Sequence, residues 1–202
     1  AEVSAFLQRY AGTYQEDRLR NDWLLQLGKN RDFQGFARYY PAFRMRDDRE
    51  VRCYALYADA TLGGRGGSDA AHELRDAWYA QRDSDEGCTL AAGALRQKGV
   101  IRDDDVWRKA RLAAETNRMG AARTAVGVVD GAAALSVPGI FSNPASYLAS
   151  QADTGSRSAR ELAVLALLRM AAGNAMSAAQ AMRTGWASRL EARDRNWVWG
   201  EI

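Results

Sequence analysis

The fold is decided by residues 53–129, which read CYALYADATLGGRGGSDAAHELRDAWYAQRDSDEGCTLAAGALRQKGVIRDDDVWRKARLAAETNRMGAARTAVGVV. Apolar side chains recur in this stretch three and four residues apart, as they do on one face of an amphipathic helix. Glycines interrupt the pattern at Gly64, Gly99 and Gly120. Glycine often ends a helix, because it adopts the left-handed conformation without steric cost. The stretch therefore predicts a succession of helices separated by short breaks.

The same pattern extends over the rest of the chain. Apolar stripes at helical spacing precede it at residues 19–27 and 33–40, and Pro41 is expected to end the second of these helices. No segment shows the apolar–polar alternation of a half-buried strand. Helices of roughly 10–16 residues would form pairs that repeat about every 30–40 residues. This spacing predicts an all-α fold, a right-handed α-superhelix or α-solenoid of irregular helical pairs.

We expect one α-superhelical domain over residues 1–202. Residues 1–129 carry the more regular helical pairs, and residues 130–157 are expected to form an irregular connection because they are rich in glycine and proline. Residues 158–202 are expected to hold further helices that continue into a missing C-terminal part.

Capping-box patterns, in which a serine precedes Glu or Gln by three residues, predict where the last helices begin. There are three of them: Ser158 with Glu161, Ser177 with Gln180, and Ser188 with Glu191. Earlier in this part of the chain, Asn143 followed by Pro144 predicts a helix start of another kind, with Asn as the N-cap and Pro in the first turn.

The composition narrows the functional classes. The chain is 47% hydrophobic and 26% charged, with a net charge of +3 that is interspersed rather than blocked. This balance is typical of a solvated globular surface and gives no indication of nucleic-acid binding. No apolar run approaches the roughly 18 residues that a membrane-spanning helix needs. We therefore expect neither a nucleic-acid partner nor a membrane span.

The two cysteines, Cys53 and Cys88, leave two interpretations open. They lack both CxxC spacing and a histidine cluster, so they make a poor metal site. They are either buried thiols in a reducing compartment or one disulfide in an oxidising one. A disulfide would close a loop of about 35 residues and stabilise the fold by roughly 3–4 kcal/mol.

No catalytic, cofactor-binding or metal-binding residue can be identified. His72 is the one histidine, and the acidic run Asp103–Asp105 is typical of a helix start. The glycine-rich segment 63–68 lacks the Lys-Ser/Thr ending of a phosphate-binding loop. The 25 acidic residues single out no catalytic pair.

The tryptophans are expected to be mainly structural. Trp23, Trp78 and Trp107 occupy apolar positions of three different helices, which favours burial over stacking against a sugar. Trp197 and Trp199 cannot share one helical face. One of these two is therefore expected to be exposed, or to be covered by chain beyond Ile202.

Several segments resemble the superhelical region of the soluble lytic murein transglycosylases of Gram-negative bacteria. The segments that carry the resemblance are FLQRYAGTYQEDRLRNDWLLQLGKNRDFQGF (6–36), VRCYALYADATLG (51–63), LRDAW (74–78), GCTLAAGALRQKGVIRDDDVWRKARLAAE (87–115) and RDRNWVWGEI (193–202). The resemblance implies a ring-like α-superhelical scaffold that carries a C-terminal, lysozyme-like catalytic domain. It covers most of the chain and is most specific over residues 51–115.

The family cleaves the bond between N-acetylmuramic acid and N-acetylglucosamine in peptidoglycan without water, and leaves a 1,6-anhydromuramyl end. One catalytic Glu acts first as acid and then as base. It lies in a Glu-Ser motif followed by a Gly-Leu-Met-Gln-type motif, and this chain contains neither. The resemblance therefore implies a scaffold segment that is cut at both ends, is inactive alone and needs no cofactor.

The resemblance also implies a Cys53–Cys88 disulfide, a periplasmic location, and two partners: peptidoglycan, bound weakly by the scaffold surface, and the catalytic domain of the same polypeptide. The alternative is an independent α-solenoid adaptor of tetratricopeptide type, which would have free thiols and a protein ligand. The apolar ending WVWGEI favours the scaffold, because a terminal capping helix should present a polar outer face.

Overall fold

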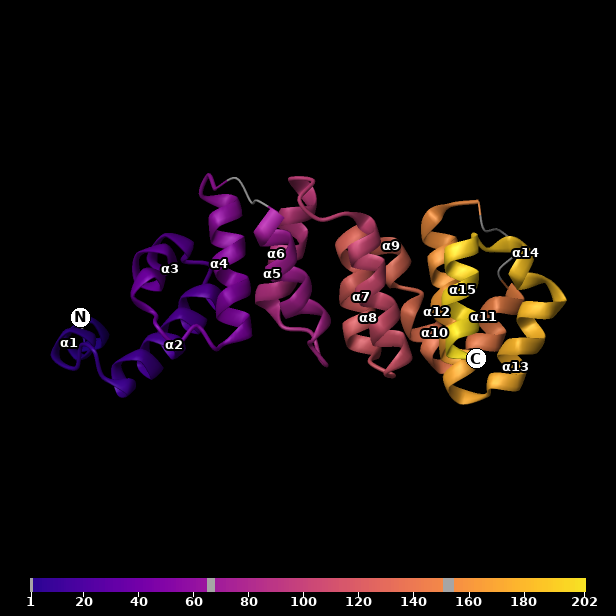
Figure 1. The fold of residues 1–202 in the computed structure, drawn as a ribbon, viewed down its shortest axis with the longest axis horizontal. Coiled ribbons are helices and arrows are strands. Elements are labelled where there is room, and N and C mark those ends of the chain that lie inside the picture. The colour runs from indigo at the N-terminus through magenta and orange to yellow at the C-terminus, as the bar shows by residue number, and fades with distance from the viewer. Residues whose placement is uncertain (1, 65–67, 151–154) are drawn as a thin grey trace. The chain divides into compact units, whose positions relative to one another are not determined.

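In the computed structural model, residues 2–64, 68–150 and 155–202 are described (Figure 1). Helices, turns and loops account for these residues, and none of them forms a strand. The all-α class predicted from the sequence is therefore confirmed. The chain divides into two compact units, an N-terminal unit of residues 1–102 and a C-terminal unit of residues 103–202.

The N-terminal unit consists of short helices that follow one another along the chain. They are α1 (Glu2–Arg9), α2 (Tyr14–Lys29), α3 (Phe33–Tyr39), the 3₁₀ turn η1 (Tyr40–Ala42), α4 (Arg49–Thr61), α5 (Ser68–Tyr79) and α6 (Glu86–Gln97). Helix α3 ends at the residue before η1, which contains Pro41, as the sequence predicted. An aspartate side chain starts α4 and another starts α6, because Asp48 and Asp85 accept hydrogen bonds from backbone N–H groups of the first turn.

Two kinds of packing hold the N-terminal unit. Large apolar and aromatic side chains of α2, α3 and α4 form one cluster, whose buried members are Leu24, Leu27, Phe36, Phe43, Val51, Tyr54 and Ala58. Helices α4 and α6 pack together differently, through small residues. A Cβ atom built on Gly87 of α6 would lie 2.7 Å from the backbone oxygen of Glu50 in α4. Only glycine lets the two helices approach this closely.

The C-terminal unit is built around one buried helix. Its elements are α7 (Asp103–Glu115), α8 (Met119–Val129), α9 (Gly131–Ala134), α10 (Val137–Ser142), α11 (Pro144–Ser150), α12 (Arg157–Gly173), α13 (Ala175–Ala181), the π turn η2 (Met182–Trp186), α14 (Ala187–Arg189) and α15 (Ala192–Glu201). Helix α12 is buried over eight consecutive residues, 161–168, so it has no exposed stripe there. It lies against α7, α10, α11, α13 and α15.

Residues 130–150 are more helical than the sequence indicated, and residues 151–154 of the expected connection lie outside the described residues. Residues 130–150 form α9, α10 and α11 instead of an irregular connection. Side-chain caps explain the difference, because Asp130 accepts the N–H of Ala133 over 2.9 Å and Asn143 accepts that of Ser146 over 3.0 Å. The helix start predicted at Asn143 is confirmed.

The helix starts predicted from the three capping boxes are wrong. The N-cap of α12 is Ser156, two residues before Ser158, and the N-cap of α13 is Asn174, three residues before Ser177. Ser188 lies inside α14 rather than before a helix. In the first two cases a capping residue further upstream already satisfies the free N–H groups, so the helix begins earlier.

The tryptophans follow the prediction with one difference. Trp78 and Trp107 are each only 1% exposed, whereas Trp23 is half-buried and lies edge-on to Tyr39. Trp199 is 37% exposed. It is thus the exposed member of the C-terminal pair, as the spacing required.

Two glycines of the same helix give a matched test of the close contact between α4 and α6. Gly87→Ala is expected to lower the free energy of unfolding by about 1–3 kcal/mol, because the new methyl group meets helix backbone that cannot move aside easily. Gly93→Ala is expected to raise it by up to about 1 kcal/mol, because alanine favours helix and nothing lies within 4 Å of the new atom. Urea denaturation measures both. Equal effects of the two substitutions would contradict the close contact.

Candidate functional site

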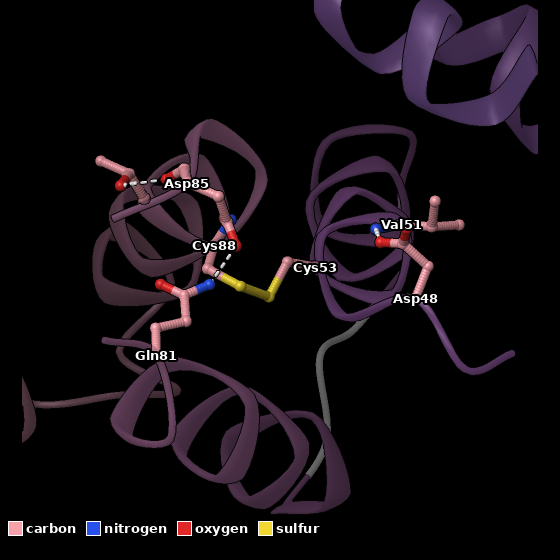
Figure 2. Close-up of a disulfide and its surroundings, with 7 residues drawn as sticks. Asp48, Val51, Cys53, Gln81, Asp85 and Cys88 are labelled. Carbon is pink, nitrogen blue, oxygen red and sulfur yellow. Dashed lines mark hydrogen bonds between the residues drawn. A yellow bond between two sulfur atoms is a disulfide. The ribbon is translucent and has the colours of Figure 1, made fainter. Parts of the chain in front are cut away.

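The sequence singled out one pair of residues, Cys53 and Cys88, and in the structure a disulfide joins them. Figure 2 shows the bond lying between α4, which carries Cys53, and α6, which carries Cys88. Their Cα atoms are 4.7 Å apart and both residues are fully buried. The bond reinforces the helix contact that also depends on Gly87. Its role is therefore to fix the N-terminal unit rather than to react with a ligand.

A half-buried carboxyl lies next to this disulfide. Asp85, the N-cap of α6, accepts the N–H of Cys88 over 2.7 Å and also accepts a hydrogen bond from the side-chain amide of Gln81 (Figure 2). Burial raises the pKa of the Asp85 carboxyl to about 6, although the N–H of Cys88 acts in the opposite direction. Asp85 therefore titrates in a range where ordinary aspartates are fully ionised.

A second cluster, which the sequence analysis missed, lies inside the C-terminal unit. It consists of Arg111 from α7, Glu161 from α12 and Asp194 from α15, and we call it the ionic triad. Arg111 donates to Glu161 Oε2 from Nε over 3.0 Å and from Nη2 over 2.7 Å, and its Nη2 also donates to Asp194 Oδ1 over 2.6 Å. The three side chains are only 3–6% exposed. The triad ties α15 to the buried centre of its unit.

The ionic triad carries one positive and two negative groups. Burial raises the pKa of Glu161, and the neighbouring Arg111 partly offsets this effect. The indole ring of Trp197 helps to stabilise the positive charge of Arg111, because the guanidinium carbon lies 5.0 Å from the centroid of the ring. Removing one partner from such a buried set typically costs about 3–5 kcal/mol, since the other charges stay buried without compensation.

A polar pocket of about 410 Å³ opens onto the triad. Every described residue that lines it is charged: Asp104, Arg157, Arg160, Glu161, Glu191, Arg193 and Asp194. Arg157 and Arg193 both donate hydrogen bonds to Asp104. Hydrogen bonds from these two arginines hold the pKa of Asp104 below its usual value. The pocket therefore offers cationic and anionic groups side by side.

The other residues that the sequence analysis considered, His72 and Asp103–Asp105, lie on helices. His72 is exposed and lies 3.4 Å from Asp76 in the same helix. Asp103–Asp105 form the first turn of α7. Residues 65–67 of the glycine-rich segment lie outside the described residues. Within the described part of the chain, no three His, Cys, Asp or Glu residues are grouped as a metal site would require.

The ionic triad could have been suspected from the sequence, but its pairing could not. Arg111 stands beside the apolar residues Ala110 and Ala114 of one helical stripe, and Glu161 opens the apolar run LAVLALL. A charge next to an apolar stripe signals a buried partner. The partners lie 50 and 83 residues away along the chain, so only tertiary structure identifies them.

Among the described residues, no helix is both long enough and apolar enough to cross a membrane.

Replacing Asp85 tests its raised pKa. The pKa of the folded protein, about 6, lies above the ordinary value of 3.8, so the stability that comes from the protonated carboxyl is complete below pH 3.8 and lost as the pH rises through about 6. Asn keeps the cap but does not titrate. The free energy of unfolding of the wild type, measured relative to Asp85→Asn by urea denaturation at each pH, is therefore expected to fall over this range. Because the carboxyl is only partly buried and solvent screens it, the expected fall is about 1–2 kcal/mol.

Asp130 provides the opposite control. Hydrogen bonds from backbone N–H groups, that of Ala133 first, hold its pKa below the ordinary value. Relative to Asp130→Asn, the wild type should therefore lose stability as the pH falls below 3.8. If the stability difference between wild type and Asp85→Asn changed with pH in the same direction as that between wild type and Asp130→Asn, the pKa of Asp85 would not be raised by burial.

The disulfide is tested by the double substitution Cys53→Ala with Cys88→Ala. We expect the free energy of unfolding of the N-terminal unit to fall by about 3–4 kcal/mol, because the open loop gains entropy in the unfolded chain. Reduction should destabilise the wild type similarly and leave the double variant unchanged. Unfolded, unreduced wild type should take up no maleimide, and modification of both thiols would contradict the bond.

Comparison with known proteins gives a relationship at the level of the fold. No family model and no curated protein sequence matches the chain. Among solved structures, the chain is similar to the 70-kDa soluble lytic transglycosylase in its complex with bulgecin A, with a TM-score of 0.58 and 18% identity. The match covers 98% of this chain and 32% of that one, so the chain spans about a third of the transglycosylase. At this identity the likeness establishes a shared fold: nearly the whole chain has the all-α fold of part of a soluble lytic transglycosylase.

Proposed function

We propose that this chain is a non-catalytic superhelical scaffold segment of a periplasmic lytic murein transglycosylase. The parent enzyme would cleave the bond between N-acetylmuramic acid and N-acetylglucosamine and form 1,6-anhydromuramyl products. The observation that carries the proposal is the fold match along 98% of the chain. The resemblance of residues 51–115, seen in the sequence alone, is an independent support. Together the two units, residues 1–202, would form one superhelical segment.

The internal cross-links suit a scaffold. The disulfide fixes α4 to α6, and the ionic triad fixes α15 to α7 and α12. Each link stiffens a unit from inside and leaves its surface free. Such a part can hold a catalytic domain and a glycan strand in a fixed relation, which lowers the entropic cost of positioning a polymer.

The proposed partners and location rest on the fold match and on the sequence resemblance. Peptidoglycan would be bound weakly by the scaffold surface, and the catalytic domain of the same polypeptide would supply the acid–base Glu. A disulfide between buried cysteines is compatible with an oxidising compartment such as the periplasm. The related transglycosylase is itself known in complex with bulgecin A. No cofactor is required by this role.

A protein-binding adaptor is the second candidate, and one surface feature favours it. A pocket of about 320 Å³ lies over α3 and α4 in the N-terminal unit, with mainly apolar lining residues: Phe36, Ala37, Tyr40, Ala55, Ala58, Asp59, Leu62 and Gly64. Leu62 is 51% exposed. Apolar grooves of this size can accept a side chain of a protein ligand.

Digestion of purified sacculi tests the proposal. This chain, and separately the longer protein to which we assign it, would be incubated with sacculi, and the soluble products analysed by mass spectrometry. We expect anhydromuramyl ends from the longer protein and none from this chain, because the Glu-Ser motif is absent from it.

Two outcomes would overturn the proposal. Anhydromuramyl ends from this chain alone would show that it contains the catalytic residue. No such products from the longer protein, under conditions where a known transglycosylase is active, would remove the enzymatic role and leave the adaptor as the better account.

A further inference from the structure

The polar pocket in the C-terminal unit has charges of opposite sign at its two ends. Its inner end is the ionic triad, in which one guanidinium faces two carboxylates, so one negative charge is in excess. At the outer end the guanidinium groups of Arg157 and Arg193 share the single carboxylate of Asp104, so one positive charge is in excess. The two ends adjoin, because Arg193 Nε lies 3.6 Å from Asp194 Oδ1 and Arg157 Nη2 lies 4.0 Å from Glu161 Oε1, but these ion pairs are too long to be hydrogen bonds. The remaining pair, Arg160 and Glu191, is neutral, with 3.6 Å between nitrogen and oxygen.

Hydrogen-bonding capacity is left over at both ends. At the inner end, both hydrogen bonds to Glu161 go to Oε2, and among the described residues none reaches Oε1, which lies 4.0 Å from the Arg157 guanidinium. Asp194 accepts from Arg111 through Oδ1 alone. Each carboxylate therefore keeps one oxygen that can accept a hydrogen bond, although the side chains are only 3% and 6% exposed.

The outer end has spare donors. A guanidinium carries five N–H groups, and those of Arg157 and Arg193 together make three hydrogen bonds within the described residues, all to Asp104. Their side chains are 43% and 57% exposed, so an incoming anion can reach them. Arginine is suited to this task because its planar group binds carboxylates bidentately.

We propose that this pocket binds a small zwitterion, a carbon atom that carries both an ammonium and a carboxylate group. The ammonium would donate to the free oxygens of Glu161 and Asp194, and the carboxylate would accept from Arg157 and Arg193. The cavity of about 410 Å³ is within the range of small-molecule sites. An isolated anion would meet the inner carboxylates, and an isolated cation would meet the outer guanidiniums, so neither fits both ends. The inference does not rest on the proposed function.

This chemistry occurs in free amino acids and at the side-chain end of a diamino diacid within a peptide. Titration calorimetry with alanine and with Nα-acetyl-2,6-diaminopimelate separates the two sources. We expect at least one probe to bind with a Kd on the order of 1 mM or below. Alanine alone would indicate a free amino acid, and tighter binding of the acetylated probe would indicate a peptide. Binding of neither probe would overturn the proposal.

Analogues test whether both charges are needed. Alanine amide lacks the carboxylate, and N-acetylalanine lacks the ammonium. The second probe can be changed in the same two ways, so that each analogue loses one of the two charges at its zwitterionic end. Each analogue is expected to bind at least tenfold more weakly than its parent. Equal binding of either analogue would contradict a zwitterion site.

Variants locate the site. The double substitution Arg157→Gln with Arg193→Gln changes only half-exposed side chains and is expected to weaken binding at least tenfold. Arg123→Gln is the control, because Arg123 is exposed on α8 of the same unit and should leave binding unchanged. Glu161→Gln, checked for folding by circular dichroism, should also weaken binding. Unchanged affinity in the double arginine variant would overturn the proposal.

Discussion

Close approach of helices through small side chains is the constraint on which the fold depends. In the N-terminal unit α4 and α6 meet where Gly87 faces the backbone of Glu50, and a Cβ atom there would lie 2.7 Å from that oxygen. In the C-terminal unit α7 packs against α8, and the two helices bury six alanines, Ala110, Ala113, Ala114, Ala121, Ala122 and Ala125. Small residues bring helix axes close but bury little area each. Where helices meet in this way, the contact has to fit along its length, because small side chains cannot extend to fill a gap.

This dependence explains why each unit has a cross-link in its interior. The disulfide lies on the α4–α6 contact of the N-terminal unit. The ionic triad lies on the contact of α12 with α7 and α15 in the C-terminal unit. The two links differ in kind. The disulfide restricts the unfolded chain, whereas a buried ion pair mainly penalises arrangements that leave its charges unpaired. In the triad, Glu161 and Asp194 each keep one oxygen that accepts no hydrogen bond from the described residues. The polar pocket beside the triad can therefore offer these two oxygens to a ligand.

The sequence predicted the class of fold because helical spacing is a local signal. The apolar stripe of residues 33–40 and its end at Pro41 correspond directly to α3 and η1. Helix starts were less predictable, because Ser158 competed with Ser156 and the choice depends on backbone conformation. The triad was not predictable, since Arg111 finds its partners through tertiary packing. The pairing of Cys53 with Cys88 came from a family resemblance, since two cysteines alone leave free thiols equally open.

Amide hydrogen exchange of the oxidised protein tests the central claim most directly. If close helix contacts hold the two units, the slowest-exchanging amides in the N-terminal unit will lie in α4 and α6, around Cys53 and Cys88. In the C-terminal unit they will lie in α7 and in residues 161–168 of α12. The contradictory result is maximal protection in α2 and α3, with α6 exchanging quickly. That result would mean that the apolar cluster around Leu24 and Phe36, rather than the small-residue contact, holds the N-terminal unit.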